Sequence, residues 1–364
     1  MTKNDTVTAL GAMSGTSLDG IDAAVVVTDG IEIFDFGPTY FREYSTKERA
    51  ILHSALGHWP DTVTDEVAEL IETTHASALS GFDRIDVIGF HGQTLAHDPD
   101  GGRTHQCGDG QVLASVLNCP VVWDFRSADM KFGGQGAPLA PFYHFALAKY
   151  VGALAPIAFL NLGGVGNITY VDPRFAKPEQ DGALLAFDTG PANAPINDLM
   201  MDRLGKPCDA AGALAKTGQV DDAIISDFLS SSYFFKMPPK SLDRNDFTDL
   251  LDASSSLSDA DAAATLTAAC VMAVSEALRH LPHPPKTIYV TGGGRKNTTM
   301  MDMLNAAVAP DVTAIEDIGL DGDMLEAQAF AYLAVRVMRG LPTSCASTTG
   351  VRAAVSGGTI SRPS

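Results

Sequence analysis

A short run of small, hydroxyl-bearing and acidic residues stands near the start of the chain, in "GAMSGTSLDGID" at residues 11–22. Glycines let a backbone approach a ligand closely, and successive N–H and hydroxyl groups can bind a polyphosphate. Asp19 or Asp22 could reach a phosphate-bound Mg²⁺, directly or through water. The stretch is not a Walker sequence, because GxxxxGK[ST] is absent. The alternative interpretation is a β-hairpin turn, in which Gly, Ser and Asp are ordinary.

A second carboxylate, Asp188, follows an apolar run in "FDTGPAN" at 187–193. A carboxylate at a strand end can act as a general base. Asp-Thr-Gly also occurs in aspartic proteases, but those need two carboxylates that share a proton, and this chain has one such triplet. The structural alternative is a turn in which Asp188 or Thr189 caps the segment that follows.

Four more polar residues are candidates for contacts with a ligand, and each has a structural alternative. His91 follows a buried-type strand, and it could instead be a satisfied core histidine. Arg126 and Gln135 flank a Gly-rich bend, where an Asp–Arg pair could simply brace the loop. Glu326 begins the last long helix, a favourable place for any acid.

The glycine cluster "VTGGGRKN" at 290–297 follows a strand and precedes a helix. Its glycines would let a flat group such as adenosine lie against the backbone. The alternative is an ordinary strand-to-helix turn in which Asn297 is the N-cap.

The elements that position these residues alternate in a way typical of α/β proteins. Each half of the chain begins with a strand, a Gly-rich turn and a strand, at "TALGAMSGTSLDGIDAAVVV" and at "PIAFLNLGGVGNITYVD". Helices and strands then alternate, which indicates a weak internal duplication. Two such lobes would bring their opening turns face to face across a cleft, where ligands of α/β folds tend to bind. The small, polar tail at 347–364 is expected to be a surface loop.

Composition limits the classes of function. The chain has 364 residues, 45% of them hydrophobic, which suggests two folded domains. A formal net charge of -19 argues against nucleic acid as a partner. The five cysteines form no CxxC pair, which indicates free thiols in a reducing compartment. The first ten residues lack a signal-peptide core, and no uncharged apolar stretch is long enough to span a bilayer. We therefore expect a soluble cytoplasmic protein without a membrane partner.

The order of these motifs resembles that of the anhydro-N-acetylmuramic acid kinase family, from about residue 10 to 338. The resemblance rests on "GAMSGTSLDGID", "GFHGQT", "CGDGQVLA", "DFRSADMKFGGQGAPLAP", "NLGGVGNIT", "FDTGPAN", "VTGGGRKN" and "LEAQAFAYLA". It implies the sugar kinase, heat-shock-70 and actin-like architecture, an α/β fold of two ribonuclease-H-like lobes with a ligand cleft between them. We expect residues 1–150 to form the N-terminal lobe, joined by 340–364, and residues 151–339 to form the C-terminal lobe.

The resemblance also implies an activity. The enzyme would use ATP and Mg²⁺ to open 1,6-anhydro-N-acetylmuramic acid with water and to phosphorylate O6. The products would be N-acetylmuramic acid 6-phosphate and ADP, formed during murein recycling inside a bacterial cell. Its partners would be ATP and a small sugar, and a homodimer is compatible with this role.

Roles are carried over by motif. Asp188 would be the general base, and Asp19 would bind the metal ion. The ATP-binding residues would be Gly15, Thr16, Ser17, Leu18, Asp19, Gly20, Ile21 and Asp22 at the phosphates, with Gly292, Gly293, Gly294 and Asn297 near the nucleoside. The sugar would be bound by His91, Arg126, Gln135 and Glu326. The chain departs from the family's usual "DTGPGN" at one position, where Ala192 replaces the second glycine. In the segment that follows, Asn197 stands beside Asp198. Both features bear on the fit of the sugar.

Two alternatives remain open at this stage. A levoglucosan-type anhydrosugar kinase would share these motifs but act on a sugar without lactyl and acetamido groups. An actin- or chaperone-like nucleotide-gated binding protein would hydrolyse ATP slowly without a sugar. That second class needs a partner surface or substrate domain, and no additional domain is evident in the sequence.

Overall fold

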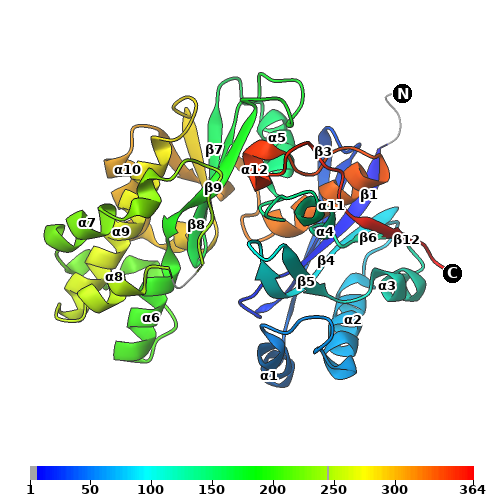
Figure 1. The fold of residues 1–364 in the computed structure, drawn as a ribbon, viewed down its shortest axis with the longest axis horizontal. Helices are drawn as coiled ribbons and strands as arrows, with labels where there is room; N and C mark the ends of the chain where they lie inside the picture. Colours follow the sequence, from blue (N-terminus) through cyan, green and yellow to red (C-terminus); the bar gives the residue numbers. More distant parts are fainter. Residues whose placement is uncertain (1–5, 244–245) are drawn as a thin grey trace. The chain divides into compact units, whose positions relative to one another are not determined.

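The computed structural model describes residues 6–243 and 246–364 (Figure 1). The chain forms two compact units, which are described separately. The first consists of Met1–Gly152 together with Asp323–Ser364, and the second of Ala153–Gly322.

A seven-stranded sheet forms the centre of the first unit, in the order β12-β6-β4-β1-β2-β3, with β5 paired to β4. The strands are β1 (Val7–Ser14), β2 (Gly20–Thr28), β3 (Ile33–Glu43), β4 (Val87–Asp98), β5 (Arg103–Cys107), β6 (Val121–Trp123) and β12 (Thr359–Ser361). β1 is antiparallel to β2 and parallel to β4, and β4 is parallel to β6.

Helices cover both faces of this sheet. They are α1 (Thr46–Ala55), α2 (Asp65–Leu79), α3 (Gly110–Leu117), α4 (Ser127–Lys131), α5 (Pro141–Tyr150), α11 (Leu325–Met338) and α12 (Ala346–Thr349). Side chains alternate between the faces along each strand. Leu10 and Phe90 therefore join the apolar cluster under α1, α2 and α3, whereas Gly11 faces α11. A Cβ at Gly11 would lie 1.8 Å from the carbonyl oxygen of Ala327, so glycine lets α11 pack directly on the sheet.

The second unit has a five-stranded sheet in the order β11-β10-β7-β8-β9. Its strands are β7 (Ile157–Leu162), β8 (Val165–Val171), β9 (Leu184–Pro191), β10 (Thr287–Thr291) and β11 (Asp311–Ala314). Its helices are α6 (Asn193–Leu204), α7 (Asp222–Leu229), α8 (Thr248–Ala253), α9 (Asp259–Leu278) and α10 (Thr298–Ala307), with short 3-10 turns η1 (Ala210–Gly212), η2 (Ala215–Thr217), η3 (Ser232–Phe235), η4 (Gly293–Lys296) and η5 (Ile315–Ile318).

Helix α9 is the central helix of this unit. The helix is long and apolar enough to cross a membrane, but 72% of its most apolar 18-residue stretch is buried inside the protein. Ala263, Leu266 and Cys270 lie in the apolar cluster with strands β7 and β8. This burial is that of a core helix in a globular unit.

The two sheets repeat one topology. In each, the first strand is central, the second and third follow antiparallel on one side, and the next two lie parallel on the other side. The paths β3-β2-β1-β4-β6 and β9-β8-β7-β10-β11 are therefore equivalent, and the β1–β2 and β7–β8 turns occupy equivalent places. This order confirms the expected duplication and the two ribonuclease-H-like units of the actin-like class. The ligand cleft expected between them stays a prediction.

Two expectations from the sequence are wrong. Helix α11 was expected in the C-terminal lobe, but Asp323–Ser364 belongs to the first unit because the small residues of α11 pack on β1 and β4. The tail was expected to be a surface loop, yet Thr349 and Val351 are fully buried and β12 pairs with β6. Small residues suit such close packing as well as they suit loops, which explains the error.

Candidate functional site

The β1–β2 turn is held at its base by polar side chains from neighbouring elements. The buried Ser14 hydroxyl, at the end of β1, donates to the side-chain oxygen of Gln93 on β4 and lies 3.0 Å from the Tyr44 hydroxyl. The Gln93 amide in turn donates to the carbonyl oxygen of Gly15 at 3.1 Å. Gln93 therefore fixes where the turn begins, a role that the sequence interpretation missed.

The turn leaves part of its polar surface open. Leu18 adopts a positive φ of 57° and is buried, and its N–H closes the turn on the Gly15 carbonyl oxygen at 3.2 Å. Thr16, Ser17 and Asp19 are exposed. A Cβ at Gly15 would meet only the Ser17 hydroxyl oxygen, at 3.7 Å. This open, donor-rich surface fits an anionic ligand such as a polyphosphate.

Not every residue of the predicted phosphate turn is available to a ligand. The Leu18 and Ile21 side chains belong to the apolar core of the first unit. Gly20 is required by packing, because a Cβ there would lie 2.3 Å from the carbonyl oxygen of Arg42. Asp22 lies within β2, opposite Met13, and is partly buried. These residues shape the turn, and the exposed ones remain as candidate contacts.

The described residues contain no cluster of three or more His, Cys, Asp or Glu side chains that could hold a metal. Mg²⁺ usually takes one or two carboxylates and completes its octahedron with water and phosphate oxygens. The exposed Asp19 carboxylate beside the open turn fits that mode of binding.

His91 and Arg126 form a buried polar pair in the first unit. The Nδ1 atom of His91 lies 2.8 Å from the Gly92 carbonyl oxygen, so it carries the proton and donates. Nε2 then accepts from Nε of Arg126 at 3.1 Å. Burial, and next the Arg126 charge, hold the pKa of His91 well below its usual range, so the imidazole is neutral.

Glu326, in the first turn of α11, lies within the electrostatic reach of Arg126. Burial lowers the pKa of Arg126 to about 10, and Glu326 opposes that change, so the guanidinium stays charged at neutral pH. Reduced hydration raises the pKa of Glu326, with Arg126 opposing the rise. A neutral histidine is thus hydrogen-bonded to a cation, and Glu326 lies within electrostatic reach of that cation, among the residues for which the sequence predicted contacts with the sugar.

Gln135 lies in a Gly-rich bend organised by the buried carboxylate of Asp129. That carboxylate accepts hydrogen bonds from the Gly136 N–H at 2.7 Å, the Ser344 hydroxyl at 2.5 Å and the Thr349 hydroxyl at 2.6 Å. The Gln135 N–H donates to the Thr349 carbonyl oxygen at 2.8 Å. The C-terminal segment therefore shapes the bend that presents Gln135, which no sequence motif indicated.

In the second unit, Asp188 lies on β9, at the edge of the sheet. Its Oδ2 atom accepts the Leu242 N–H at 2.8 Å. Burial raises the pKa of the Asp188 carboxyl to about 6, although the Leu242 hydrogen bond opposes the rise. Within the described residues Oδ1 has no hydrogen-bond partner. A carboxylate that titrates near neutrality with one free oxygen can take up a proton at working pH.

A row of polar residues crosses the sheet beside Asp188. Asn167 on β8 pairs with Asp188, Asn161 on β7 pairs with Asn167, and Thr291 on β10 pairs with Asn161. Cross-strand partners point to the same face of a sheet. Asn161 and Asn167 therefore share a face with the carboxylate; the only signal in the sequence was an asparagine on either side of the glycine turn in "NLGGVGN".

The predicted nucleoside turn is mostly occupied by its own packing. Gly292 has a positive φ of 70°, and a Cβ there would lie 2.2 Å from Oδ1 of Asn161. Gly294 packs on Leu162, where a Cβ would lie 2.5 Å from the leucine Cβ. Asn297 caps α10 by accepting the Met300 N–H at 3.0 Å, as the structural alternative expected. Gly293 has an open Cβ position, with its nearest neighbour, Nδ2 of Asn193, at 3.6 Å.

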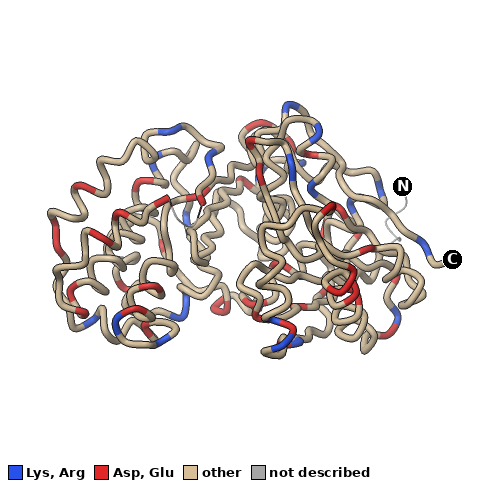
Figure 2. Tube along the Cα trace, turned by 60° about the horizontal axis from the view of Figure 1, so that its bottom comes forward, with Lys and Arg blue, Asp and Glu red and all other residues tan. Residues whose placement is uncertain are grey.

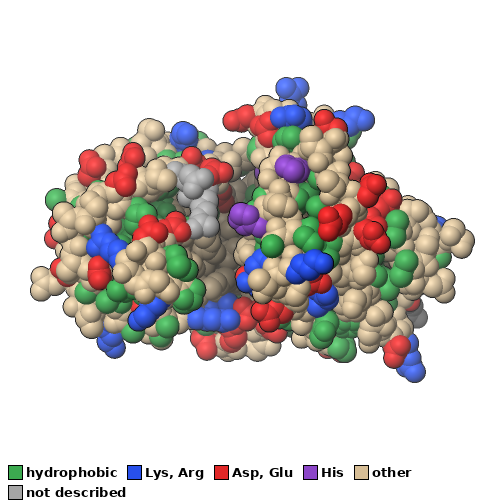
Figure 3. Space-filling model, turned by 90° about the horizontal axis from the view of Figure 1, so that it is seen from below, with side chains coloured by type: hydrophobic (Ala, Val, Ile, Leu, Met, Phe, Trp, Pro, Cys, Tyr) green, Lys and Arg blue, Asp and Glu red, His purple; other side chains and the backbone are tan. Residues whose placement is uncertain are grey.

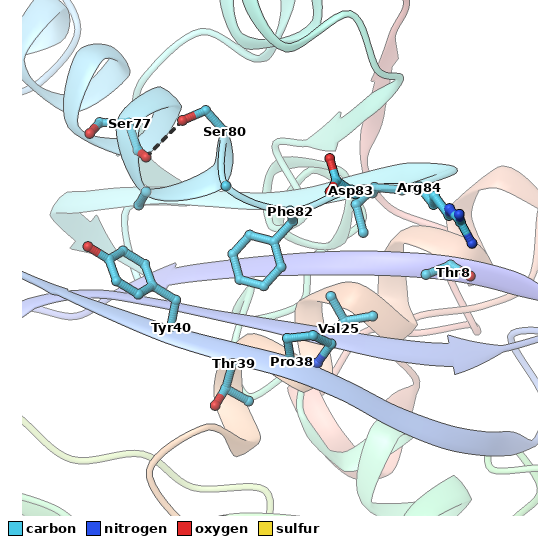
Figure 4. Close-up of a pocket in the computed structure, with 13 residues that line it drawn as sticks. Thr8, Val25, Pro38, Thr39, Tyr40, Ser77, Ser80, Phe82, Asp83 and Arg84 are labelled. Atoms are coloured by element: carbon cyan, nitrogen blue, oxygen red, sulfur yellow. Dashed lines mark hydrogen bonds between the residues drawn. The ribbon is translucent and has the colours of Figure 1, made fainter.

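A separate pocket of about 740 Å³ lies in the first unit (Figure 4). Tyr40 and Phe82 face each other across it, and Arg84 and Thr8 lie at its other end. Thr8 lies near the start of β1, away from the β1–β2 turn, and Val25 pairs with Leu10 in the middle of the two strands. None of the predicted site residues lines this pocket, so it is distinct from the candidate site.

Asp and Glu residues are spread along the chain in both units in Figure 2. The face in Figure 3 shows acidic and basic side chains intermixed, without an extended basic surface on that face.

The repeated fold and the Gly-rich turn define a protein of the actin-like class that includes sugar kinases. The family model for anhydro-N-acetylmuramic acid kinase matches residues 7–363. The chain is 58% identical over 361 residues to the enzyme of that name from Roseobacter denitrificans, covering 99% of this chain and 96% of the relative. It is 61% identical over 364 residues to the Cereibacter sphaeroides enzyme of that name, covering 100% and 98%. The chain belongs to the anhydro-N-acetylmuramic acid kinase family, so the resemblance is confirmed.

Two solved structures are less similar to this chain. An activator of the 2-hydroxyisocaproyl-CoA dehydratase from Clostridium difficile, with bound ADPNP, is 11% identical with a TM-score of 0.47, covering 91% of this chain and 96% of that one. A ROK family glucokinase from Streptomyces griseus is 12% identical with a TM-score of 0.42, covering 90% and 99%.

Proposed function

We propose that the chain is an ATP-dependent kinase that opens 1,6-anhydro-N-acetylmuramic acid with water and phosphorylates O6. Membership of the family over nearly the whole chain supports the overall activity. The observation that carries the mechanism is the Asp188 carboxyl, with its pKa raised to about 6, one oxygen held by Leu242 and the other without a partner among the described residues.

Asp188 is the general base in this proposal. Oδ1 takes a proton from a water molecule as the water oxygen forms a bond to C1 of the sugar. The C1–O6 bond breaks, and O6 keeps its electron pair and bonds to the γ-phosphorus of ATP. The bond from that phosphorus to the bridging oxygen breaks, ADP leaves, and the proton passes from Asp188 to solvent. Water activation by a carboxylate resembles the chemistry of inverting glycosidases.

The β1–β2 turn binds the phosphates of ATP in this proposal. The exposed Thr16 and Ser17 and the open backbone at Gly15 supply donors. Asp19 would help to hold Mg²⁺, which neutralises charge on the phosphates when bound. The open surface at Gly293 is the place we assign to the nucleoside. Transfer of a phosphoryl group needs mainly positioning and charge stabilisation, which such a turn can provide.

Arg126 is the main determinant of the sugar class in this proposal. A muramic sugar carries a lactyl carboxylate, and the planar guanidinium of arginine suits a carboxylate well. His91 uses Nε2 to hold Nε of Arg126, which leaves the terminal nitrogens for a ligand. Gln135 and Glu326 would add polar contacts to hydroxyl or amide groups. Levoglucosan has no carboxylate, so a site built on Arg126 favours the muramic substrate.

We further propose that the enzyme works in the cytoplasm, in murein recycling, with ATP and the anhydrosugar as its small-molecule partners. All five cysteines are free thiols, and four of them are buried, which suits a reducing compartment.

The direct test measures ADP formation with and without 1,6-anhydro-N-acetylmuramic acid, with levoglucosan as the comparison sugar. We expect strong stimulation by the muramic sugar and little by levoglucosan. Turnover in ¹⁸O-water should leave the product phosphate unlabelled, because O6 itself attacks ATP. Equal ADP formation without sugar, or label in the sugar phosphate, would refute the proposal.

A further inference from the structure

The segment from Tyr233 to Leu242 lies along the open edge of β9 at Asp188. The Asp188 N–H donates to the Lys240 carbonyl oxygen at 3.0 Å. The Tyr233 hydroxyl donates to the Asp188 carbonyl oxygen, and the Leu242 N–H donates to Oδ2 of Asp188 at 2.8 Å. One segment thus satisfies both backbone groups of Asp188 and one of its carboxylate oxygens. The geometry of the base depends on where this segment is held.

Lys240 is a buried cation within this segment, with 7% of its surface exposed. Its ammonium group donates to the Tyr233 carbonyl oxygen at 3.1 Å. The ammonium also lies 4.5 Å from the centre of the Tyr233 ring and 5.7 Å from that of Phe187. No carboxylate forms an ion pair with it in the described part of the chain. A carbonyl oxygen and two aromatic faces therefore replace the water that this cation has lost.

His280 does not offer Lys240 a second acceptor. Its Nε2 atom is 3.5 Å from the Lys240 ammonium but 2.8 Å from the Phe234 carbonyl oxygen. The shorter contact requires Nε2 to carry a proton and to donate to that carbonyl, so it cannot accept from lysine. Lys240 and His280 thus bond to neighbouring carbonyl groups of η3 and fasten this turn from two sides.

We propose that Lys240 is a positioning residue that ties the 240–242 end of this segment to η3, at the segment's other end, and thereby keeps the Leu242 N–H on the Asp188 carboxylate. The inference rests on the proposed role of Asp188 as the base. A hydrogen bond to the ionised form of a carboxyl favours that form. Without the lysine the segment loosens, the Leu242 hydrogen bond weakens, and Asp188 becomes harder to ionise.

The titratable groups around Asp188 are Tyr233, Lys240 and His280. The experiment follows the ionisation of Asp188. Burial, followed by the charges of Asp188 and Asp246, raises the pKa of Tyr233 above its usual value, so its hydroxyl remains a donor. Burial, followed by the charge of Lys236, lowers the pKa of Lys240. His280 faces Lys240 and the Phe234 carbonyl.

The test compares Lys240→Met with Lys236→Met. Methionine keeps the length and apolar stem of lysine but removes the cation. Lys236 is an exposed lysine on the same segment, 6.0 Å from the centre of the Tyr233 ring, and serves as the matched control. In Lys240→Met we expect the acidic limb of the kcat/KM profile to move up by about one pH unit, the effect of losing one hydrogen bond to a charged group. Activity should return close to the parent value above pH 8, and KM for ATP should not change.

An acidic limb in Lys240→Met that coincides with that of Lys236→Met would overturn the proposal. A loss of activity that is uniform with pH would also overturn it, because a merely structural lysine would give that result.

Hydrogen exchange supplies a readout that does not need activity. In Lys240→Met, or in Lys240→Gln if the methionine variant does not fold, the Leu242 amide should exchange at least tenfold faster. Amides of β8 should be unaffected. Unchanged exchange at Leu242 would refute the proposed anchor even if Asp188 is the base. Conversely, near-normal turnover of Asp188→Asn would refute the role of Asp188 as the base. The exchange of the Leu242 amide would then test the role of Lys240 independently.

Discussion

The Nε–H of Arg126 donates to Nε2 of His91 at 3.1 Å, and that nitrogen can accept only because the ring proton lies on Nδ1, toward Gly92. The neutral imidazole thus orients the guanidinium without competing with it for an anionic ligand. His91 lies within β4 and Arg126 follows β6, and β4 and β6 are adjacent parallel strands. The pairing of these strands brings the two side chains together.

Replacement of Arg126 should therefore alter the choice of sugar. We expect Arg126→Met to lower kcat/KM for 1,6-anhydro-N-acetylmuramic acid by about 10–100-fold, the value of a charge-assisted hydrogen bond or two. The effect on levoglucosan should be much smaller. Arg103→Met is the control, since Arg103 lies over the Trp59 ring at 4.2 Å and is largely exposed. Equal losses for both sugars would show that Arg126 does not contact the lactyl carboxylate.

Asp188→Asn should abolish most turnover while the protein stays folded. Asparagine has nearly the same shape and can still accept the Leu242 N–H, but it cannot take a proton from water. Loss of a general base commonly costs about 10²–10⁴ in rate. Steady-state kinetics and calorimetric titration with ATP should show a fall in kcat with little change in ATP binding. A variant with near-normal kcat would leave Asp188 as a structural residue only.

The same substitution should stabilise the protein above pH 6. The pKa of Asp188 is raised to about 6 in the folded state, against about 4 for an unfolded aspartate. Between these values the unfolded chain releases its proton first, so ionisation of Asp188 destabilises the fold as the pH rises. We expect Asp188→Asn to exceed the parent by about 3 kcal/mol in free energy of unfolding at pH 8 and to match it near pH 4. Urea unfolding at both pH values measures this; a constant difference would contradict the raised pKa.

Much of the fold was predictable because local patterns and global topology agree. The strand–turn–strand openings of both halves predicted the duplication, and apolar runs marked the central strands. Helix α11 was assigned to the wrong unit because its sequence shows a buried helix but not which sheet it covers. The glycines that admit it, Gly11 and Gly89, lie far away in the sequence, and a Cβ at Gly89 would lie 2.1 Å from the Phe330 carbonyl oxygen.

The residues of the candidate site can be proposed from the sequence, but the residues that support them cannot. Turn glycines and strand-end carboxylates stand out in a sequence. Asn297 shows the limit, since a cap and a ligand contact use the same residue type at the same position. Gln93 holds a backbone group 78 residues away in the chain. Asp129 and Lys240 each hold a backbone group seven residues away, in irregular segments where no residue pattern marks such a contact.

Removal of the Asp129 charge should weaken both stability and sugar binding. Its buried carboxylate accepts hydrogen bonds from Gly136, Ser344 and Thr349. In asparagine an NH₂ group replaces one carboxylate oxygen, and this group cannot accept from these donors. Leaving a buried hydrogen-bonding group without its partner costs about 1–3 kcal/mol. We expect Asp129→Asn to unfold at lower urea and to raise KM for the sugar through Gln135. Asp124→Asn, whose carboxylate accepts from the Ser127 hydroxyl on a partly exposed turn, should change little. Equal stability of the two variants would argue against the bend depending on Asp129.

Gly15→Val tests the assignment of the β1–β2 turn to ATP. A Cβ at Gly15 would meet only the Ser17 hydroxyl, at 3.7 Å, and Gly15 does not have a positive φ. The fold should therefore tolerate valine, and thermal unfolding should change little. The new methyl groups would occupy the surface that we assign to the phosphates, so ATP binding should weaken by at least tenfold while sugar binding persists.

Two comparisons make this result decisive. Gly81→Val is the matched control, because Gly81 also lies in open space without a positive φ, in the same unit but away from the turn. It should leave the affinity for ATP unchanged. Gly20→Ala should behave differently from both, because its Cβ would lie 2.3 Å from the Arg42 carbonyl oxygen and must move the backbone. We expect this variant to lose stability by about 1–3 kcal/mol, as overpacked sites do. If Gly15→Val binds ATP as tightly as Gly81→Val in calorimetric titrations, the turn is a hairpin connection and the phosphates bind elsewhere.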